Sequence, residues 1–126
     1  MKVFSTLLFT VLLTGSLLAQ NGDELLIPAG EPGILNQTIF GDTTETGERV
    51  NPNRIYVLQR GVPYVITESM RWEDFHIHLR AEEGDGPRPL IIYTPGAGGE
   101  SISQVFRLQS GANLTMEGIH LTGRDI

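Results

Sequence analysis

FRLQSGANLTMEGIHLTG, residues 106–123, holds the pattern from which the fold can be predicted. Phe106 and Leu108 alternate with polar residues, and a second alternating run begins at Leu114. Such alternation is typical of strands that are buried on one face. Gly118 shifts the alternation by one residue, which indicates a bulge or a corner. The turn between the two runs can be a hairpin, or it can be a corner in a coil whose strands pair with the coils before and after.

Similar short runs continue toward the N-terminal side. We expect strands of the usual length over residues 54–59, 62–67, 75–80 and 89–93, with turn-rich corners between them. Residues 69–74 are interpreted as a loop that carries an aromatic plug. After residue 40 the chain lacks a helical period, so the sequence predicts an all-β fold.

Two all-β architectures fit this pattern, a small antiparallel sandwich and the stacked coils of a parallel β-helix. Two-residue hairpin signals are scarce, and the single Asp-Gly pair lies inside a longer polar turn. Residues 75–80 and 114–121 share alternating apolar positions and an outward histidine. About one three-sided coil of chain lies between them, which favours stacked coils.

The N-terminal part of the chain has a different composition. Residues 1–20 combine a basic start, an apolar run and small residues, which is typical of a secretory signal peptide. Residues 21–53 are expected to form an entry segment and cap, with a short amphipathic helix over residues 33–40. The β-helix coils would occupy residues 54–126. The sequence therefore predicts a secreted or cell-surface protein with no membrane association after signal cleavage.

Composition narrows the classes of function. The 126 residues contain no cysteine, which excludes disulfides, thiolate metal sites and cysteine nucleophiles. Lys and Arg number 9 against 15 Asp and Glu, so the net charge is −6. An acidic chain without a basic run argues against nucleic acid and anionic membranes as partners. A few arginines can still bind uronate carboxylates locally.

Three stretches resemble a known superfamily. They are RIYVLQRG at 54–61, LRAEEGDGPRPLII at 79–92 and NLTMEGIHLTG at 113–123. Together they are similar to the N-terminal cap and first coils of pectate-lyase-like right-handed parallel β-helix proteins, and to the start of alginate- and chondroitin-type polysaccharide lyases. The resemblance implies a right-handed parallel β-helix with a capping helix and about two coils. It also implies a secreted protein that binds or degrades acidic polysaccharide, often with calcium.

The motifs that carry catalysis in that superfamily find no match in this chain, so no catalytic residue and no metal ligand is predicted. We expect the chain to be the N-terminal part of a longer β-helix, with further coils of the same chain as its partner and calcium bound only in those coils. This segment would act as a folding cap and would not cleave glycans by itself. The alternatives are a non-catalytic cell-surface adhesin and a small glycan-binding module.

Three residues are candidates for binding an acidic polysaccharide. Trp72 offers a ring for sugar stacking, or alternatively plugs the first coil, and Arg80 and Arg107 offer guanidinium groups for uronate carboxylates. His76 and His78 share a strand face and could bind zinc with a third ligand such as His120; a solvated pair is the favoured interpretation. The turn with Glu82, Glu83 and Asp85 carries oxygen ligands suited to calcium, and a solvated turn is favoured there as well.

Overall fold

The computed structural model describes residues 22–94 and 104–123, which contain nine strands and one helix. In chain order these are β1 (Glu24–Ile27), α2 (Ile34–Gly41), β2 (Ile55–Leu58), β3 (Pro63–Ile66), β4 (Met70–Trp72), β5 (His76–Ala81), β6 (Leu90–Tyr93), β7 (Phe106–Leu108), β8 (Asn113–Glu117) and β9 (His120–Gly123). The predicted signal peptide and residues 95–103 lie outside the described residues.

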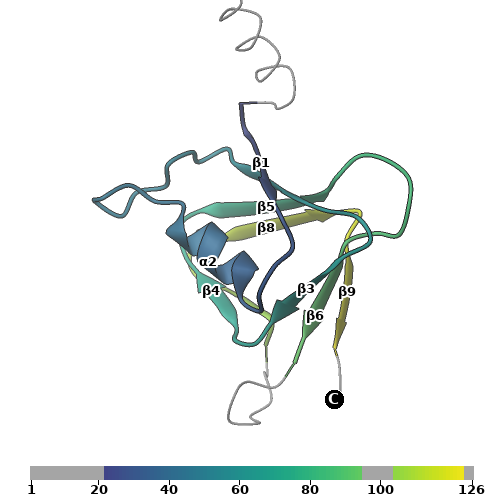
Figure 1. Cartoon of the computed structure of the whole chain (residues 1–126). Helices are drawn as coiled ribbons and strands as arrows, with labels where there is room; N and C mark the ends of the chain where they lie inside the picture. Colours follow the sequence, from purple (N-terminus) through teal and green to yellow (C-terminus); the bar gives the residue numbers. More distant parts are fainter. Residues whose placement is uncertain (1–21, 95–103, 124–126) are drawn as a thin grey trace, which may run out of the picture.

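All pairs of these strands are parallel, and they build three sheets with the strand orders β1-β2-β5-β8, β3-β6-β9 and β4-β7. Figure 1 shows the three sheets around a shared interior. The chain runs from one sheet to the next and then returns to the first, one strand further along. Parallel neighbours need such a long connection, and here the other two sheets provide it. The prediction of an all-β chain with parallel strands is confirmed.

The register supports the similarity that the sequence suggested between residues 75–80 and 114–121. Ile77 of β5 lies opposite Leu114 of β8, and Leu79 lies opposite Met116. Successive side chains of a strand point to opposite faces, so Ile77 and Leu79 are fully buried while His76 is exposed. The inward and outward faces predicted for this strand are therefore confirmed.

One apolar core fills the interior between the three sheets. Its fully buried side chains come from every sheet and include Leu58, Ile66, Met70, Ile77 and Ile91. Because each coil contributes residues at matching register positions, side chains of neighbouring strands stack in rows. Burying a large aliphatic side chain contributes about 1.5–3 kcal/mol, so these rows account for much of the cohesion between coils.

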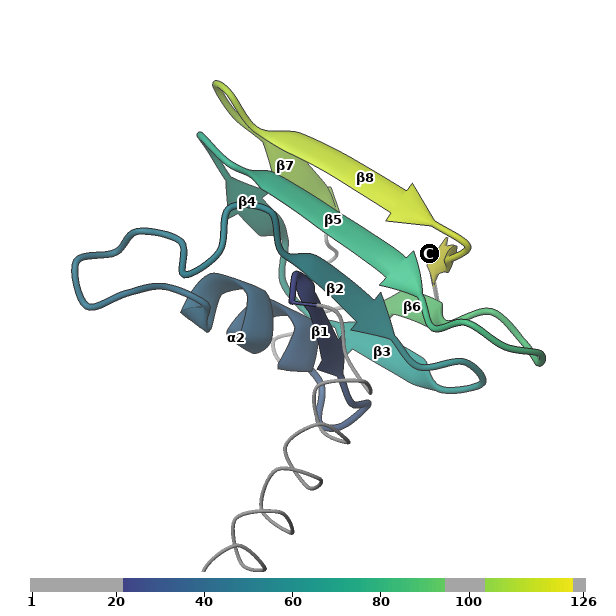
Figure 2. The ribbon, with the colours of Figure 1, turned by 90° about the horizontal axis from the view of Figure 1, so that it is seen from above.

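Helix α2 covers the end of this interior beside β1 and β3, as the view in Figure 2 shows. Leu35 and Ile39 lie on one face of the helix and are buried in the core. The backbone N–H of Gly33, at the helix start, donates to the carbonyl of Val65 at 2.9 Å. The helix predicted over residues 33–40 is confirmed, and it covers strands that would otherwise be open at this end.

Gly118 forms the corner between β8 and β9, as the shift in alternation indicated. Its φ of 69° lies in the left-handed region, which glycine adopts without steric cost. A Cβ at this position would lie 3.2 Å from the Cβ of Ala81 in the strand below. Both the backbone conformation and the close approach therefore favour glycine.

The interpretation of residues 69–74 as a loop is wrong. Met70 to Trp72 form β4, and the side chains of Met70 and Trp72 point into the core with exposures of 0% and 4%. Only three residues take part, so the alternation is too short to indicate a strand by itself. The pairing with β7 supplies the partner that holds this short strand in place.

Candidate functional site

The outer face of β5 and β8 carries a row of polar side chains. The rings of His76 and His78 stack with centroids 5.9 Å apart and planes 15° from parallel. His76 Nε2 lies 2.7 Å from Thr115 Oγ1, and His78 Nε2 lies 3.1 Å from Glu117 Oε1. Both imidazoles are therefore engaged by side chains of the neighbouring coil.

This face does not assemble the zinc site considered from the sequence. His120 begins β9, in another sheet from His76 and His78. Within the described residues there is no cluster of three or more His, Cys, Asp or Glu side chains that could hold a metal ion. The turn that carries Glu82, Glu83 and Asp85 is among the described residues, and it forms no such cluster. There, Glu82 Oε1 accepts a hydrogen bond from the backbone N–H of Arg60 at 3.5 Å.

Arg80 lies on the same outer face but its charge has a partner. Its guanidinium forms an ion pair with Glu24 of β1, which reaches it across the intervening strand β2. The Nε atom of Arg80 is buried and has no hydrogen-bond partner among the described residues. A glycan carboxylate at Arg80 would have to compete with Glu24.

Trp72 lies in the core and not on the surface. Its indole N–H donates to the carbonyl of Phe75 at 3.0 Å, and its ring packs edge-on against Phe106 at 6.4 Å between centroids. With 4% of the residue exposed, the ring offers no free face for a sugar. The buried ring agrees with the alternative interpretation, in which Trp72 plugs the first coil.

Arg107 lies in a different environment. It occupies β7 directly opposite Arg71 of β4, and both residues are exposed. Neither guanidinium forms an ion pair within the part of the chain that the structure describes. Like charges in directly opposite positions of a ladder are destabilising. Two exposed guanidiniums without ion pairs thus lie side by side on one face of this sheet, which suits an anion.

Arg71 was not among the candidates that the sequence indicated. The outward position of Arg71 follows from its place between Met70 and Trp72, which are both apolar. That signal is present in the sequence, but it becomes usable only when the segment is recognised as a strand.

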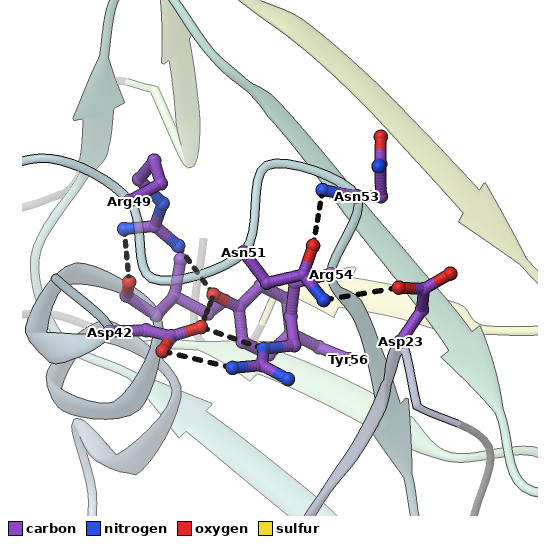
Figure 3. Close-up of polar contacts among 8 residues, drawn as sticks. Asp23, Asp42, Arg49, Asn51, Asn53, Arg54 and Tyr56 are labelled. Carbon is purple, nitrogen blue, oxygen red and sulfur yellow. Dashed lines mark hydrogen bonds and ion pairs between the residues drawn. The ribbon is translucent and has the colours of Figure 1, made fainter.

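A second polar cluster connects the loop after α2 to β2 and is shown in Figure 3. Asp42 accepts hydrogen bonds from Arg54 Nε at 3.0 Å and from the hydroxyl of Tyr56 at 2.8 Å. Arg49 donates to the Tyr56 hydroxyl and, at 2.7 Å, to the carbonyl of Ile39 in the last turn of α2. The cluster fastens the loop after the helix to the sheet.

The electrostatics of this cluster agree with a structural role. Burial by itself would raise the pKa of Asp42, but hydrogen bonds from Arg54 and Tyr56 and the charges of Arg54 and Arg49 lower the pKa below its ordinary value. Burial and the hydrogen bond to Asp42 raise the pKa of Tyr56. The hydrogen bond to Asp42 raises the pKa of Arg54. The Asp42 carboxylate and the Arg54 guanidinium therefore stay charged, and the Tyr56 phenol stays neutral, near neutral pH.

Comparison with protein-family models, with curated proteins and with solved structures found no match. The resemblance to the pectate-lyase-like superfamily accordingly rests on the stretches at 54–61, 79–92 and 113–123 together with the parallel sheets. Among the described residues, no helix has the length and apolar character needed to cross a membrane.

Proposed function

We propose that this chain forms the cap and first coils of a right-handed parallel β-helix that is exported and binds acidic polysaccharide. Its own residues serve as a folding cap, while catalysis and any calcium belong to further coils. The observation that carries glycan binding is the pair of Arg71 and Arg107 on the outer face of sheet β4–β7. This pair lies in a chain whose net charge is −6.

The order of the strands supports a β-helix. The sequence β2, β3, β4 passes once through the three sheets, and β5, β6, β7 repeats the passage with parallel pairing at every step. Strands β8 and β9 begin the passage again. Helix α2 covers one end, as a cap of stacked coils must, because an uncovered end leaves apolar side chains in water.

The opposite end supports the stacking of further coils. Leu108, Met116 and Leu121 lie above the core at β7, β8 and β9 and are 43%, 39% and 37% exposed. Their register partners in the coil below are Trp72, Leu79 and Ile91, which are buried. A further coil would bury the exposed residues in the same way.

The Arg71–Arg107 pair supports binding of a polyanion. Neighbouring strands lie about 4.8 Å apart, so the two guanidinium groups can reach the same short stretch of a ligand. Guanidinium groups bind carboxylate and sulfate groups through paired hydrogen bonds. An acidic glycan would also relieve the repulsion between the two like charges.

The proposal is tested by affinity electrophoresis of the chain in gels that contain polygalacturonate or alginate, at low ionic strength. We expect retardation by these glycans and none by a neutral dextran. Replacing both residues, as Arg71→Gln with Arg107→Gln, should abolish the retardation. Both side chains are exposed, so folding should be retained.

Arg88→Gln is the matched control for the single variant Arg107→Gln, because each removes one positive charge from an exposed residue and Arg88 lies outside sheet β4–β7. Glycan binding that decreases equally with Arg88→Gln would indicate attraction by overall charge and would contradict the proposed site. Retardation by neutral dextran would contradict it as well.

The absence of cleavage by the chain itself is tested separately. We expect no release of unsaturated uronate when the purified chain is incubated with the same acidic glycans, with or without added calcium. Ultraviolet absorbance at the wavelength of the unsaturated product provides the measurement. An increase above the buffer control would show that the chain itself carries lyase activity.

A further inference from the structure

A groove of about 460 Å³ lies on the outer surface of sheet β3–β6–β9. Pro63, Leu90 and His120 lie opposite one another at the starts of the three strands, and Ile92 follows Leu90 on the same face. Pro63, Leu90 and Ile92 make the floor apolar. The volume lies within the range of about 300–1,000 Å³ that is usual for small-molecule sites.

The wall of the groove comes from the turn between β5 and β6 and is held in position. Arg60 Nε donates to the carbonyl of Glu82 at 2.7 Å, and a terminal nitrogen of Arg60 donates to the carbonyl of Gly86 at 3.1 Å. The backbone N–H of Gly61 donates to the carbonyl of Pro87 at 3.1 Å. Pro87 and Arg88, which line the groove, therefore stand at a turn that is fastened to the turn between β2 and β3.

The charges around this groove differ from those of the molecule as a whole. The chain has a net charge of −6, yet the described residues that line the groove include no Asp or Glu. Arg88 is exposed at the rim and has no ion pair or hydrogen bond from its side chain among the described residues. His120 also lines the groove. An apolar floor with a free guanidinium at its edge is complementary to a ligand that has an apolar body and one acidic group.

We propose that this groove binds a small amphipathic carboxylate. The apolar part of the ligand packs on Pro63, Leu90 and Ile92, and its carboxylate accepts hydrogen bonds from Arg88, with His120 as a second polar contact. Sheet β4–β7, with its two arginines, is a different sheet, so this site is independent of glycan binding.

The test is a titration of the ¹⁵N-labelled chain with sodium octanoate, followed by amide chemical shifts. We expect saturable shifts centred on Val62, Leu90, Ile92 and His120. The uncharged analogue 1-octanol has the same apolar chain without the carboxylate and should bind about tenfold more weakly, as expected for the loss of a charge-assisted hydrogen bond. Arg88→Gln should weaken octanoate binding by a similar factor.

Two further variants keep the test decisive. Pro63→Glu places a carboxylate on the groove floor at an exposed position and should abolish octanoate binding without unfolding the chain. Arg71→Gln removes the same charge as Arg88→Gln from sheet β4–β7 and should leave octanoate binding unchanged. The two arginine variants thus separate the two sites, since Arg71→Gln should weaken only glycan binding.

Three results would overturn the proposal. The first is equal affinity for octanoate and 1-octanol, and the second is octanoate binding that Arg88→Gln leaves intact. The third is a set of shifts centred on Leu108 and Met116, which would show that octanoate binds the apolar edge of the last coil. Any one of these results would show that the groove does not bind a carboxylate as proposed.

Discussion

Leu79 and Met116 lie opposite each other in neighbouring strands, but Leu79 is fully buried and Met116 is 39% exposed. The same difference separates Ile91 from Leu121 and Trp72 from Leu108. The strands of Leu79 and Ile91 have neighbours on both sides, whereas Leu108, Met116 and Leu121 lie in the last described strand of their sheets. Burial in this fold therefore depends on the position of a coil in the stack more than on the residue type at a given register.

The largest effect is expected from truncating the inner member of such a pair. Leu79→Ala leaves a cavity in the core and should lower the free energy of unfolding by about 3 kcal/mol. Met116→Ala at the opposing position should cost less than about 1 kcal/mol, since its side chain is already partly in water. Urea denaturation of both variants provides the measurement. Equal losses would mean that the outer coil is as well packed as the inner one.

The cap at the other end of the stack should be nearly as sensitive to substitution. Asp42→Asn removes the charge that accepts hydrogen bonds from Arg54 and Tyr56 and leaves the Arg54 guanidinium without its carboxylate, so we expect a loss of about 2 kcal/mol. The same denaturation experiment measures it. Glu117→Gln is the control, because Glu117 is exposed and pairs with His78 on the surface. A loss as large in the control would contradict a special role for the cap cluster.

The cap should also be sensitive to acid. The pKa of Asp42 in the folded state lies below its ordinary value of 3.8. A lowered carboxyl pKa stabilises the fold above the unfolded-state value, and this contribution is lost as the pH falls through the folded-state value. The difference in stability between the natural chain and Asp42→Asn should thus be constant above about pH 5 and shrink as the pH falls below about 4. A difference that persisted unchanged to about pH 2 would show that the charge is not responsible.

The smallest losses of stability are expected from glycine substitutions at two equivalent corners, one in the first coil and one in the last. Gly61, between β2 and β3, has a φ of 76° and open space where a methyl group would lie, whereas a methyl group on Gly118 would meet Ala81 at 3.2 Å. Gly61→Ala should cost about 1 kcal/mol for the left-handed backbone alone. Gly118→Ala should cost somewhat more because the strand below must also give way. Thermal unfolding of the two variants tests the order, and a larger loss at Gly61 would reverse the argument.

Much of the fold could be predicted from local pattern. Strands such as His76–Ala81 alternate over enough residues to reveal both their type and their buried face. The shared pattern of residues 75–80 and 114–121 favoured stacked coils. Its first part lies in β8, which pairs with β5, whereas His120 lies in β9, which pairs with β6. The helix over residues 33–40 followed from its apolar spacing. Each of these features is encoded in a short stretch of sequence.

The features that escaped prediction depend on contacts between distant stretches. Strand β4 has three residues and becomes a strand only through its pairing with β7. The juxtaposition of Arg71 and Arg107 depends on the lengths of all the turns between them. The cluster of Asp42, Arg54 and Tyr56 joins a polar loop to a strand, and nothing in the loop itself indicates a half-buried carboxylate.

The predicted binding residues show the same limit. Trp72 was considered from its residue type, and its register in β4 places it in the core. Arg80 points outward as expected, but Glu24 from a strand two positions away engages it. Alternation predicts which way a side chain points. Whether its charge is free to bind a ligand depends on partners that are distant in the sequence.

Arg49 has a consequence for how the chain opens locally. Its guanidinium contacts the end of α2 through the carbonyl of Ile39, the hydroxyl of Tyr56 in β2, and the face of the Phe75 ring at 4.3 Å from its centroid. Helix, first coil and the start of the second coil are thereby joined, so this end cannot fray one element at a time. Native-state hydrogen exchange should therefore be slowest in β2 and β5, with opening there requiring global unfolding, and fastest in β8 and β9, where subglobal opening suffices.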